Sequence, residues 1–243
     1  MHVEKLCHEI CGWLKDQVFS SGGKGGVFGL SGGIDSAVVG VLCKKAFAEQ
    51  CLALVLPCHS QAEDMEHALA LAHNFQIPCR VVELDAVFDQ FLLALGEEKS
   101  TDKKDLSLAN IKPRLRMNTL YYYASRLSYR VIGTGNKSEI SVGYFTKYGD
   151  GGVDFEPIGD LLKEEVYELA RYLEIPEYIL QKKPSGGLWE GQDDETEMGI
   201  TYAELDRYLK GETVDAAVAE KIRRRQRYSL HKQKMPPIFA VKG

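Results

Sequence analysis

Residues 27–40 read VFGLSGGIDSAVVG, in which a glycine turn separates a short apolar run from a stretch of small apolar residues. The apolar run predicts a buried strand at 27–30, and the small-residue stretch predicts a helix over 36–49. Gly32 and Gly33 would let the backbone bend sharply or approach a ligand closely. A turn from a strand into a helix aims backbone N–H groups at one point, so this stretch predicts an anion site.

Apolar runs of strand length recur along the chain, at 27–30, 51–57, 79–84 and 129–135. Helical patterns separate these runs, so the sequence predicts a parallel sheet covered by helices on both faces. This arrangement is a doubly wound, Rossmann-like α/β fold. Ligands of such sheets bind beyond the carboxyl ends of the strands. We therefore expect chemistry where the chain leaves its strands, after Leu30 and after Ile132.

Helices are expected at 3–19, 36–49, 60–74, 86–95, 112–127, 160–173, 202–210 and 214–228. Ser60 and Glu63 have the spacing of a capping box, with Ser60 as the N-cap of the third of these helices. Residues 96–110 are polar and lack any period, which predicts a mobile loop or lid. Residues 136–159 are glycine-rich and are expected to be mostly irregular.

The composition limits the classes of partner and the compartment. The 243 residues include 30 Lys and Arg against 35 Asp and Glu, a net charge of −5 that argues against nonspecific nucleic-acid binding. No apolar run approaches the about 20 residues of a membrane helix. The first 18 residues contain Glu4, Lys5 and His8, so they predict an amphipathic helix and not a signal peptide. Six cysteines without a C-x-x-C pair predict buried thiols in a reducing cytoplasm.

The glycine turn SGGIDS at 31–36 matches neither the G-x-G-x-x-G nor the Walker A pattern of phosphate loops. Its aspartate, Asp35, would repel a phosphate at close range. With Mg²⁺ between them, the same carboxylate becomes a ligand of the cation that the phosphates also bind. The alternative is that Asp35 and Ser36 only cap the following helix.

The turn resembles the motif of the N-type ATP pyrophosphatases, which cleave ATP between the α and β phosphates. The group includes NAD, GMP, asparagine and argininosuccinate synthetases and several tRNA-modifying enzymes. Its members share the adenylation of a carbonyl or carboxylate oxygen. The hexapeptide is specific for the group but does not identify the substrate.

A second stretch, GYFTKYGDGGVD at 143–154, resembles the motif of the NAD synthetase family. KPRLRM at 112–117, SGGLWEGQDDETEMGITY at 185–202 and HKQKMPP at 231–237 resemble further segments of that family. The resemblance is to the ammonia-dependent branch and implies a two-step reaction. The nicotinate carboxylate of deamido-NAD attacks the α-phosphate of ATP, and pyrophosphate leaves. Ammonia then displaces AMP and gives NAD, in the last step of NAD biosynthesis.

The resemblance also implies roles for individual residues. It assigns ATP to Gly29, Leu30, Ser31, Gly32, Gly33, Ile34, Asp35, Ser36, Thr134, Lys163 and Ser185. It assigns deamido-NAD to Arg114, Lys147, Asp154, His231 and Lys232, with Arg116 as a second candidate for phosphate contact. It assigns Mg²⁺ to Asp35 and Glu139, and catalysis to Asp35, Lys147 and Asp154. We hypothesise that Asp154 binds the incoming ammonium and helps to remove its proton.

The same resemblance bears on domains and partners. Glutamine-dependent members carry an additional amidase domain, for which residues 1–26 leave no room. We therefore expect a single domain over 1–243 that uses free ammonia. The family forms homodimers, and the aromatic segment TLYYYASRL at 119–127 would suit packing on a partner. Core packing against the sheet is the alternative for its tyrosines.

Two other functions remain open at this point. One is a different enzyme of the same loop class, such as a tRNA-thiolating or GMP-forming ligase, although the acidic balance and unpaired cysteines disfavour a tRNA enzyme. The other is a sensor that binds ATP without turnover. A sensor need not keep both a metal pair and a second-substrate site, which Asp35, Glu139, Lys147 and Asp154 would provide.

Overall fold

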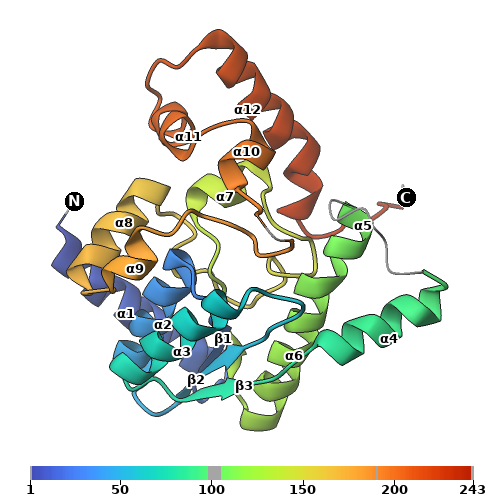
Figure 1. Ribbon diagram of the computed structural model, residues 1–243. Coiled ribbons are helices and arrows are strands. Elements are labelled where there is room, and N and C mark those ends of the chain that lie inside the picture. Colours follow the sequence, from blue (N-terminus) through green and yellow to red (C-terminus); the bar gives the residue numbers. More distant parts are fainter. Residues whose placement is uncertain (1, 98–104, 190, 242–243) are drawn as a thin grey trace.

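The sheet of this protein is parallel throughout, as the sequence predicts. The computed structural model describes residues 2–97, 105–189 and 191–241. The strands lie in the order β3-β2-β1-β4 (Figure 1). Their bounds are β1 (Gly26–Gly29), β2 (Cys51–Val55), β3 (Cys79–Val81) and β4 (Arg130–Val131). Beyond β4, an isolated parallel bridge joins Ile132 to Phe155.

The helices follow the expected alternation, with additional short ones between them. Their bounds are α1 (Val3–Ser20), α2 (Ile34–Phe47), α3 (Ala62–Asn74), α4 (Asp85–Leu95), α5 (Leu106–Ala109), α6 (Ile111–Leu127), α7 (Lys137–Val142), α8 (Lys163–Tyr172), α9 (Glu177–Leu180), α10 (Asp194–Met198), α11 (Tyr202–Leu209), α12 (Ala216–Ser229) and the 3₁₀ helix η1 (Leu230–Lys232). The predicted loop 96–110 is only partly described, because 98–104 lie outside the described residues. Its end forms α5.

Helices cover both faces of the sheet. On one face α1, α2, α3 and α8 enclose a core that includes Leu14, Val38, Leu42, Leu71 and Leu169. On the other face α4 and α6 pack on the sheet through Phe88, Leu92, Met117 and Leu120. Burial of these apolar side chains on both sides explains why the strands are continuous apolar runs.

A third group of helices lies apart from these two layers. α7, α10, α11 and α12 share a small core of Val142, Met198, Ile200, Tyr202, Leu205 and Ile222. Figure 1 shows α10, α11 and α12 stacked beyond the α/β body. The contact of Tyr202 with Glu139 brings this group against the site described below.

The predicted capping box at the start of α3 is wrong. The N-cap is Gln61, which makes no side-chain cap bond. The Ser60 hydroxyl instead accepts hydrogen bonds from the backbone N–H of Cys58, at 3.1 Å, and from Arg116 Nη2, at 3.2 Å. The Ser60 oxygen is therefore occupied by other donors, one of them the partly buried Arg116, and does not cap the helix.

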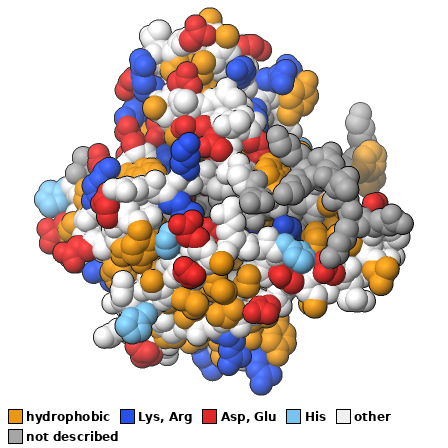
Figure 2. Space-filling view, viewed as in Figure 1, with side chains coloured by type: hydrophobic (Ala, Val, Ile, Leu, Met, Phe, Trp, Pro, Cys, Tyr) orange, Lys and Arg blue, Asp and Glu red, His pale blue; other side chains and the backbone are white. Residues whose placement is uncertain are grey.

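The helices, the cysteines and the surface charges are as the sequence composition predicts. Within the described residues, no helix has the length and apolar character needed to cross a membrane. The six cysteines are free thiols. Figure 2 shows acidic and basic side chains interspersed over one face of the molecule.

Candidate active site

A cavity of about 870 Å³ opens beyond the carboxyl ends of the strands. Its wall includes residues from the β1–α2 turn, from α6, from the segment after β4 and from 182–189. This volume lies in the range of sites that hold a nucleotide-sized ligand. The position agrees with the expectation for a doubly wound sheet.

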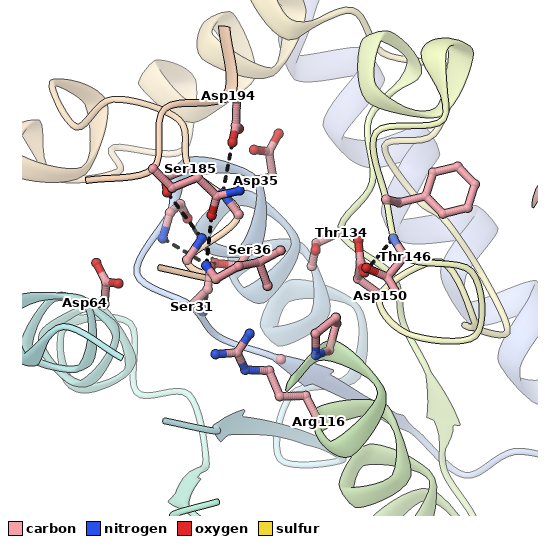
Figure 3. A pocket seen from close by; sticks show the side chains of 18 of the residues that line it. Ser31, Asp35, Ser36, Asp64, Arg116, Thr134, Thr146, Asp150, Ser185 and Asp194 are labelled. Atoms are coloured by element: carbon pink, nitrogen blue, oxygen red, sulfur yellow. Dashed lines mark hydrogen bonds between the residues drawn. The ribbon is translucent and has the colours of Figure 1, made fainter. Parts of the chain in front are cut away.

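The β1–α2 turn is held in shape by its own serines. The Ser36 hydroxyl donates to Gly33 O at 3.0 Å and accepts from the Ser31 N–H at 3.1 Å. The two serine hydroxyls lie 2.9 Å apart (Figure 3). These bonds close the turn around the N-terminus of α2.

Gly32 is required at its position in this turn. Its φ is +79°, and a Cβ there would lie 2.3 Å from the carbonyl oxygen of Asp64. The turn therefore packs directly against α3. Gly33 is the N-cap of α2 and has no side chain to cap the helix, which leaves the first N–H groups of the helix available to an anion.

Asp35 and Glu139 share one buried cation. Lys163 Nζ lies 2.5 Å from Asp35 Oδ2 and 3.2 Å from Glu139 Oε1, and the Lys163 side chain is buried. Asn136 Nδ2 also donates to Asp35 Oδ1 at 2.9 Å. Three distant segments, at the starts of α2, α7 and α8, therefore meet at one point, as the sequence assignments require.

The electrostatics of this cluster follow from burial and from its charge imbalance. Burial alone would lower the pKa of Lys163, but Asp35 and Glu139 together raise it above its usual value. Burial raises the pKa of Glu139 to about 7, because the lysine offsets only part of the desolvation. One ammonium faces two carboxylates, so the cluster keeps affinity for a further positive charge.

These residues fit a Mg²⁺ ion that arrives with a triphosphate. Within the described residues, no group of three or more His, Cys, Asp or Glu side chains is arranged to hold a metal by itself. Asp35 and Glu139 are nevertheless close enough to contact the same ammonium, so they can share one cation. Mg²⁺ commonly takes one or two carboxylates and completes its octahedron with phosphate oxygens and water.

Most of the residues assigned to ATP line this cavity, namely Gly29, Leu30, Ser31, Gly33, Ile34, Asp35, Ser36, Thr134 and Ser185. Gly32 and Lys163 lie behind its wall, where they support the turn and the carboxylates. Figure 3 shows Ser31, Asp35 and Ser36 facing the same space as Thr134 and Ser185. Arg116 projects into that space from α6, as the second phosphate candidate.

Four of the five residues assigned to deamido-NAD form a second group. Lys147 Nζ donates to His231 O at 2.7 Å, and Arg114 Nε donates to Lys147 O at 3.4 Å. Lys232 lies beside them and lines the cavity, where its ammonium donates to Gly143 O and Phe145 O, each at 2.8 Å. The fold thus unites α6, the 143–154 motif and the C-terminal motif.

Asp154 lies apart from both groups. Its carboxylate accepts from the Val131 N–H at 2.8 Å and from the Tyr121 hydroxyl at 3.1 Å. The side chain is exposed on the α6 side of the sheet and is not part of the cavity wall. Within the described residues, the chain alone does not bring Asp154 to the cavity.

The cavity wall also contains polar residues that the sequence reasoning missed. Lys182 forms an ion pair with Asp64, and Lys183 lies next to it on the wall. Asp150 and Asp194 line it as well. The two lysines lie just before the SGGLWEGQ motif, separated from it by Pro184, and this position is the signal that could have identified them.

Comparison with known proteins shows the family to which this chain belongs. The family model described as NAD synthase matches residues 6–236. The chain is 47% identical to the NH(3)-dependent NAD(+) synthetase of Carboxydothermus hydrogenoformans, over 97% of either protein. The NMN synthetase structure from Francisella tularensis is 38% identical, with a TM-score of 0.93 over 99% of this chain and 100% of that one. The NH3-dependent NAD synthetase of Campylobacter jejuni is 33% identical, with a TM-score of 0.84 over 99% and 100% of the two chains. This chain belongs to the NAD synthase family.

Proposed function

We propose that this protein uses ATP to amidate deamido-NAD with ammonia, giving NAD, AMP and pyrophosphate. The carrying observation is that the β1–α2 turn and the Asp35–Glu139 pair open into one cavity beyond the sheet. Curated relatives of this family that resemble the chain over nearly its full length are named NH3-dependent NAD synthetases.

The chain's own groups suit the first step. The free N–H groups at the start of α2 and the serine hydroxyls would bind the phosphates that leave as pyrophosphate. Arg116, Lys182 and Lys183, which also line the cavity, would neutralise the remaining charge. Catalysis here consists mainly of positioning and electrostatic stabilisation, because the attacking carboxylate is already nucleophilic.

Asp35 and Glu139 would hold a Mg²⁺ ion that accompanies ATP. Bound there, the ion would offset the negative charge of the phosphates and orient them. Lys163 would keep the two carboxylates at the separation seen here, since it contacts both of them.

The group formed by Arg114, Lys147, His231 and Lys232 would bind deamido-NAD. Its cations suit a dinucleotide with a pyrophosphate and a free carboxylate. Asp154 would bind the ammonium and accept its proton, but the chain alone holds it on the α6 side. We infer that a second copy of the chain completes this half of the site.

A homodimer is therefore part of the proposal. Exposed apolar side chains lie on α4 and α6, on the same side as Asp154 and Tyr121, and they include Phe91, Leu93, Leu95 and Tyr122. Exposed apolar groups of this size on neighbouring helices are typical of an interface. A symmetric pair would bring the two exposed faces together.

Nicotinate mononucleotide is a second candidate substrate. The Francisella structure named NMN synthetase has the higher TM-score of the two structures described above. The chemistry at the carboxylate would be the same. Nicotinate mononucleotide differs from deamido-NAD only in lacking the adenylate half. The curated relatives favour the dinucleotide.

One assay tests both candidates. The protein is incubated with ATP, Mg²⁺ and ammonium, together with either deamido-NAD or nicotinate mononucleotide, and the products are identified. The proposal is supported if AMP and pyrophosphate are released and NAD forms from deamido-NAD faster than NMN forms from nicotinate mononucleotide. Production of ADP, or AMP formation that ignores the pyridine substrate, would refute it. Replacing ammonium by glutamine tests the nitrogen source.

A further inference from the structure

Tyr202 connects the cation pair to a carboxylate with no assigned role. Its hydroxyl lies 3.1 Å from Glu139 Oε1 and 3.2 Å from Asp194 Oδ2. A phenol has one proton, so it donates to one of the two carboxylates at a time. The ring also lies 4.7 Å from the Lys163 ammonium, and both Tyr202 and Asp194 are buried.

Asp194 in turn holds the segment 182–189. Its Oδ1 accepts from the Gly186 N–H at 2.9 Å, and its own N–H donates to Pro184 O at 3.2 Å. The Tyr144 hydroxyl lies 2.8 Å from both Asp194 Oδ1 and Glu197 Oε2, and within the described part of the chain it makes no hydrogen bond to Glu139. The Asp194 carboxylate therefore links the cation pair on one side to the segment backbone on the other.

The segment depends on such bonds for its position. Residues 182–189 belong to no helix or strand, and they bring Lys182, Lys183 and Ser185 to the cavity. Backbone without ladder hydrogen bonds opens readily unless side chains fasten it. A hydrogen bond to an ionised carboxylate is about twice as strong as one between neutral groups.

We propose that Tyr202 and Asp194 are positioning residues that couple the order of residues 182–189 to occupation of the Asp35–Glu139 pair. This inference rests on the proposed binding of ATP with its cation at that pair. When a cation engages Glu139, the Tyr202 hydroxyl donates its hydrogen bond to Asp194 only. Asp194 is then fixed in the orientation that binds the Gly186 N–H, and Ser185 is held over the phosphates.

Hydrogen–deuterium exchange measured by mass spectrometry tests the coupling. Wild type, Tyr202→Phe and Tyr144→Phe are compared with and without Mg²⁺ and an ATP analogue that has a methylene group between the α and β phosphates. Peptides containing the Gly186 amide are followed, because this amide donates to Asp194, whereas the Leu188 amide donates to Gln192. In wild type we expect the analogue to slow exchange of the Gly186 amide roughly tenfold, the size of one charged hydrogen bond.

Both variants remove a hydroxyl that contacts Asp194, but only Tyr202→Phe also removes a contact with Glu139. Tyr202→Phe should bind the analogue, as measured by calorimetry, but show no slowing. Tyr144→Phe removes a hydroxyl that contacts Asp194, Glu197 and Gln192 but leaves the bond between Tyr202 and Glu139 in place, so it should retain the slowing at Gly186. Equal slowing in Tyr202→Phe and wild type, or its loss in both variants, would overturn the coupling.

Failure of the proposed function would look different. If wild type does not bind the analogue with Mg²⁺, the ATP site itself is wrong. Binding by wild type without any slowing refutes the coupling alone. If circular dichroism shows that Tyr202→Phe is unfolded, Asp194→Asn replaces it. That variant should also lose the slowing, and a wild-type response from it would refute the coupling.

Discussion

At the scale of single residues, Asp35 is the group on which the site depends most. Its two oxygens bind Lys163 and Asn136, and its neighbours in the turn line the cavity. Asp35→Asn removes the negative charge while keeping the size. We expect kcat/KM for ATP to fall on the order of 100-fold, the usual effect of losing one preorganised electrostatic group.

Pyrophosphate release under steady-state conditions measures this loss. Asp160→Asn is the matched control, because Asp160 is an exposed carboxylate at the surface that pairs only with Lys137 among the described residues. The control should keep wild-type rates. An Asp35→Asn protein with activity within a few-fold of wild type would contradict the assignment.

Glu156 supplies a prediction about pH and stability. Burial, together with Asp150 and Glu139, raises its pKa from 4.5 to about 8. The folded state therefore holds this proton more tightly than the unfolded state, and its stabilising effect is lost as the pH rises through about 8. Glu156 is half-buried, so the loss should be on the order of 1 kcal/mol between about pH 5 and about pH 9.

Denaturant unfolding of wild type and Glu156→Gln at several pH values measures that difference. The variant is neutral throughout and can still accept from the Gly135 N–H, which Glu156 binds at 3.0 Å. Its free energy of unfolding should decline less over this range. Parallel curves for the two proteins would show that Glu156 does not titrate as expected.

At the scale of elements, the β1–α2 turn is constrained by its contact with α3. Gly32→Ala combines a φ of +79° with a Cβ placed 2.3 Å from the Asp64 carbonyl oxygen. We expect it to destabilise the protein by about 2 kcal/mol or more and to weaken ATP binding, because the turn must shift. Gly12→Ala lies in α1 with nothing within 4 Å of its Cβ, so it should stabilise by about 0.5–1 kcal/mol.

Thermal and denaturant melts of both glycine variants measure these changes, and calorimetry measures ATP affinity. The comparison separates a general preference for alanine from the special requirement at position 32. If Gly32→Ala were as stable as Gly12→Ala, the packing of the turn on α3 would be wrong.

The sequence predicts the long elements well because their periodicity comes from burial. The strands near 27–30 and 51–57 form where expected, and both faces of the sheet are covered. The short α7 was missed inside a glycine-rich stretch, although Asn136 and Glu139 form a capping box there. Ser60 shows the opposite error, because its cap pattern is satisfied by a tertiary contact instead.

At the scale of the whole molecule, local patterns could not predict which distant groups meet. Asp35 and Lys163 are 128 positions apart and share a hydrogen bond of 2.5 Å. Their proximity follows from the strand order and from the packing of α8 beside α2. Neither feature can be predicted from the residues that surround Asp35 or Lys163 in the sequence. The family resemblance supplied Asp35, Glu139 and Lys163, whereas Lys182 and Asp194 emerged only from the fold.

The exposed face of α4 and α6 carries the last prediction, which concerns assembly. Leu93 and Tyr122 are 69% and 57% exposed there, and Asp154 is exposed on the same side, away from the cavity. A dimer through this face would bury the apolar side chains and could bring Asp154 to a site shared with a partner. Leu93→Glu would place a charge in that interface, where desolvation is unfavourable.

We expect wild type to elute as a dimer in size-exclusion chromatography with light scattering, and Leu93→Glu to elute as a monomer or a weakened dimer. The variant should lose amidation activity in proportion to the monomer fraction. Raising the protein concentration should restore part of the dimer and part of the activity. Tyr228→Glu adds the same charge to an exposed aromatic residue on α12 and should leave the dimer intact. A monomeric wild type with full activity would remove the partner from the mechanism and leave Asp154 without its proposed role.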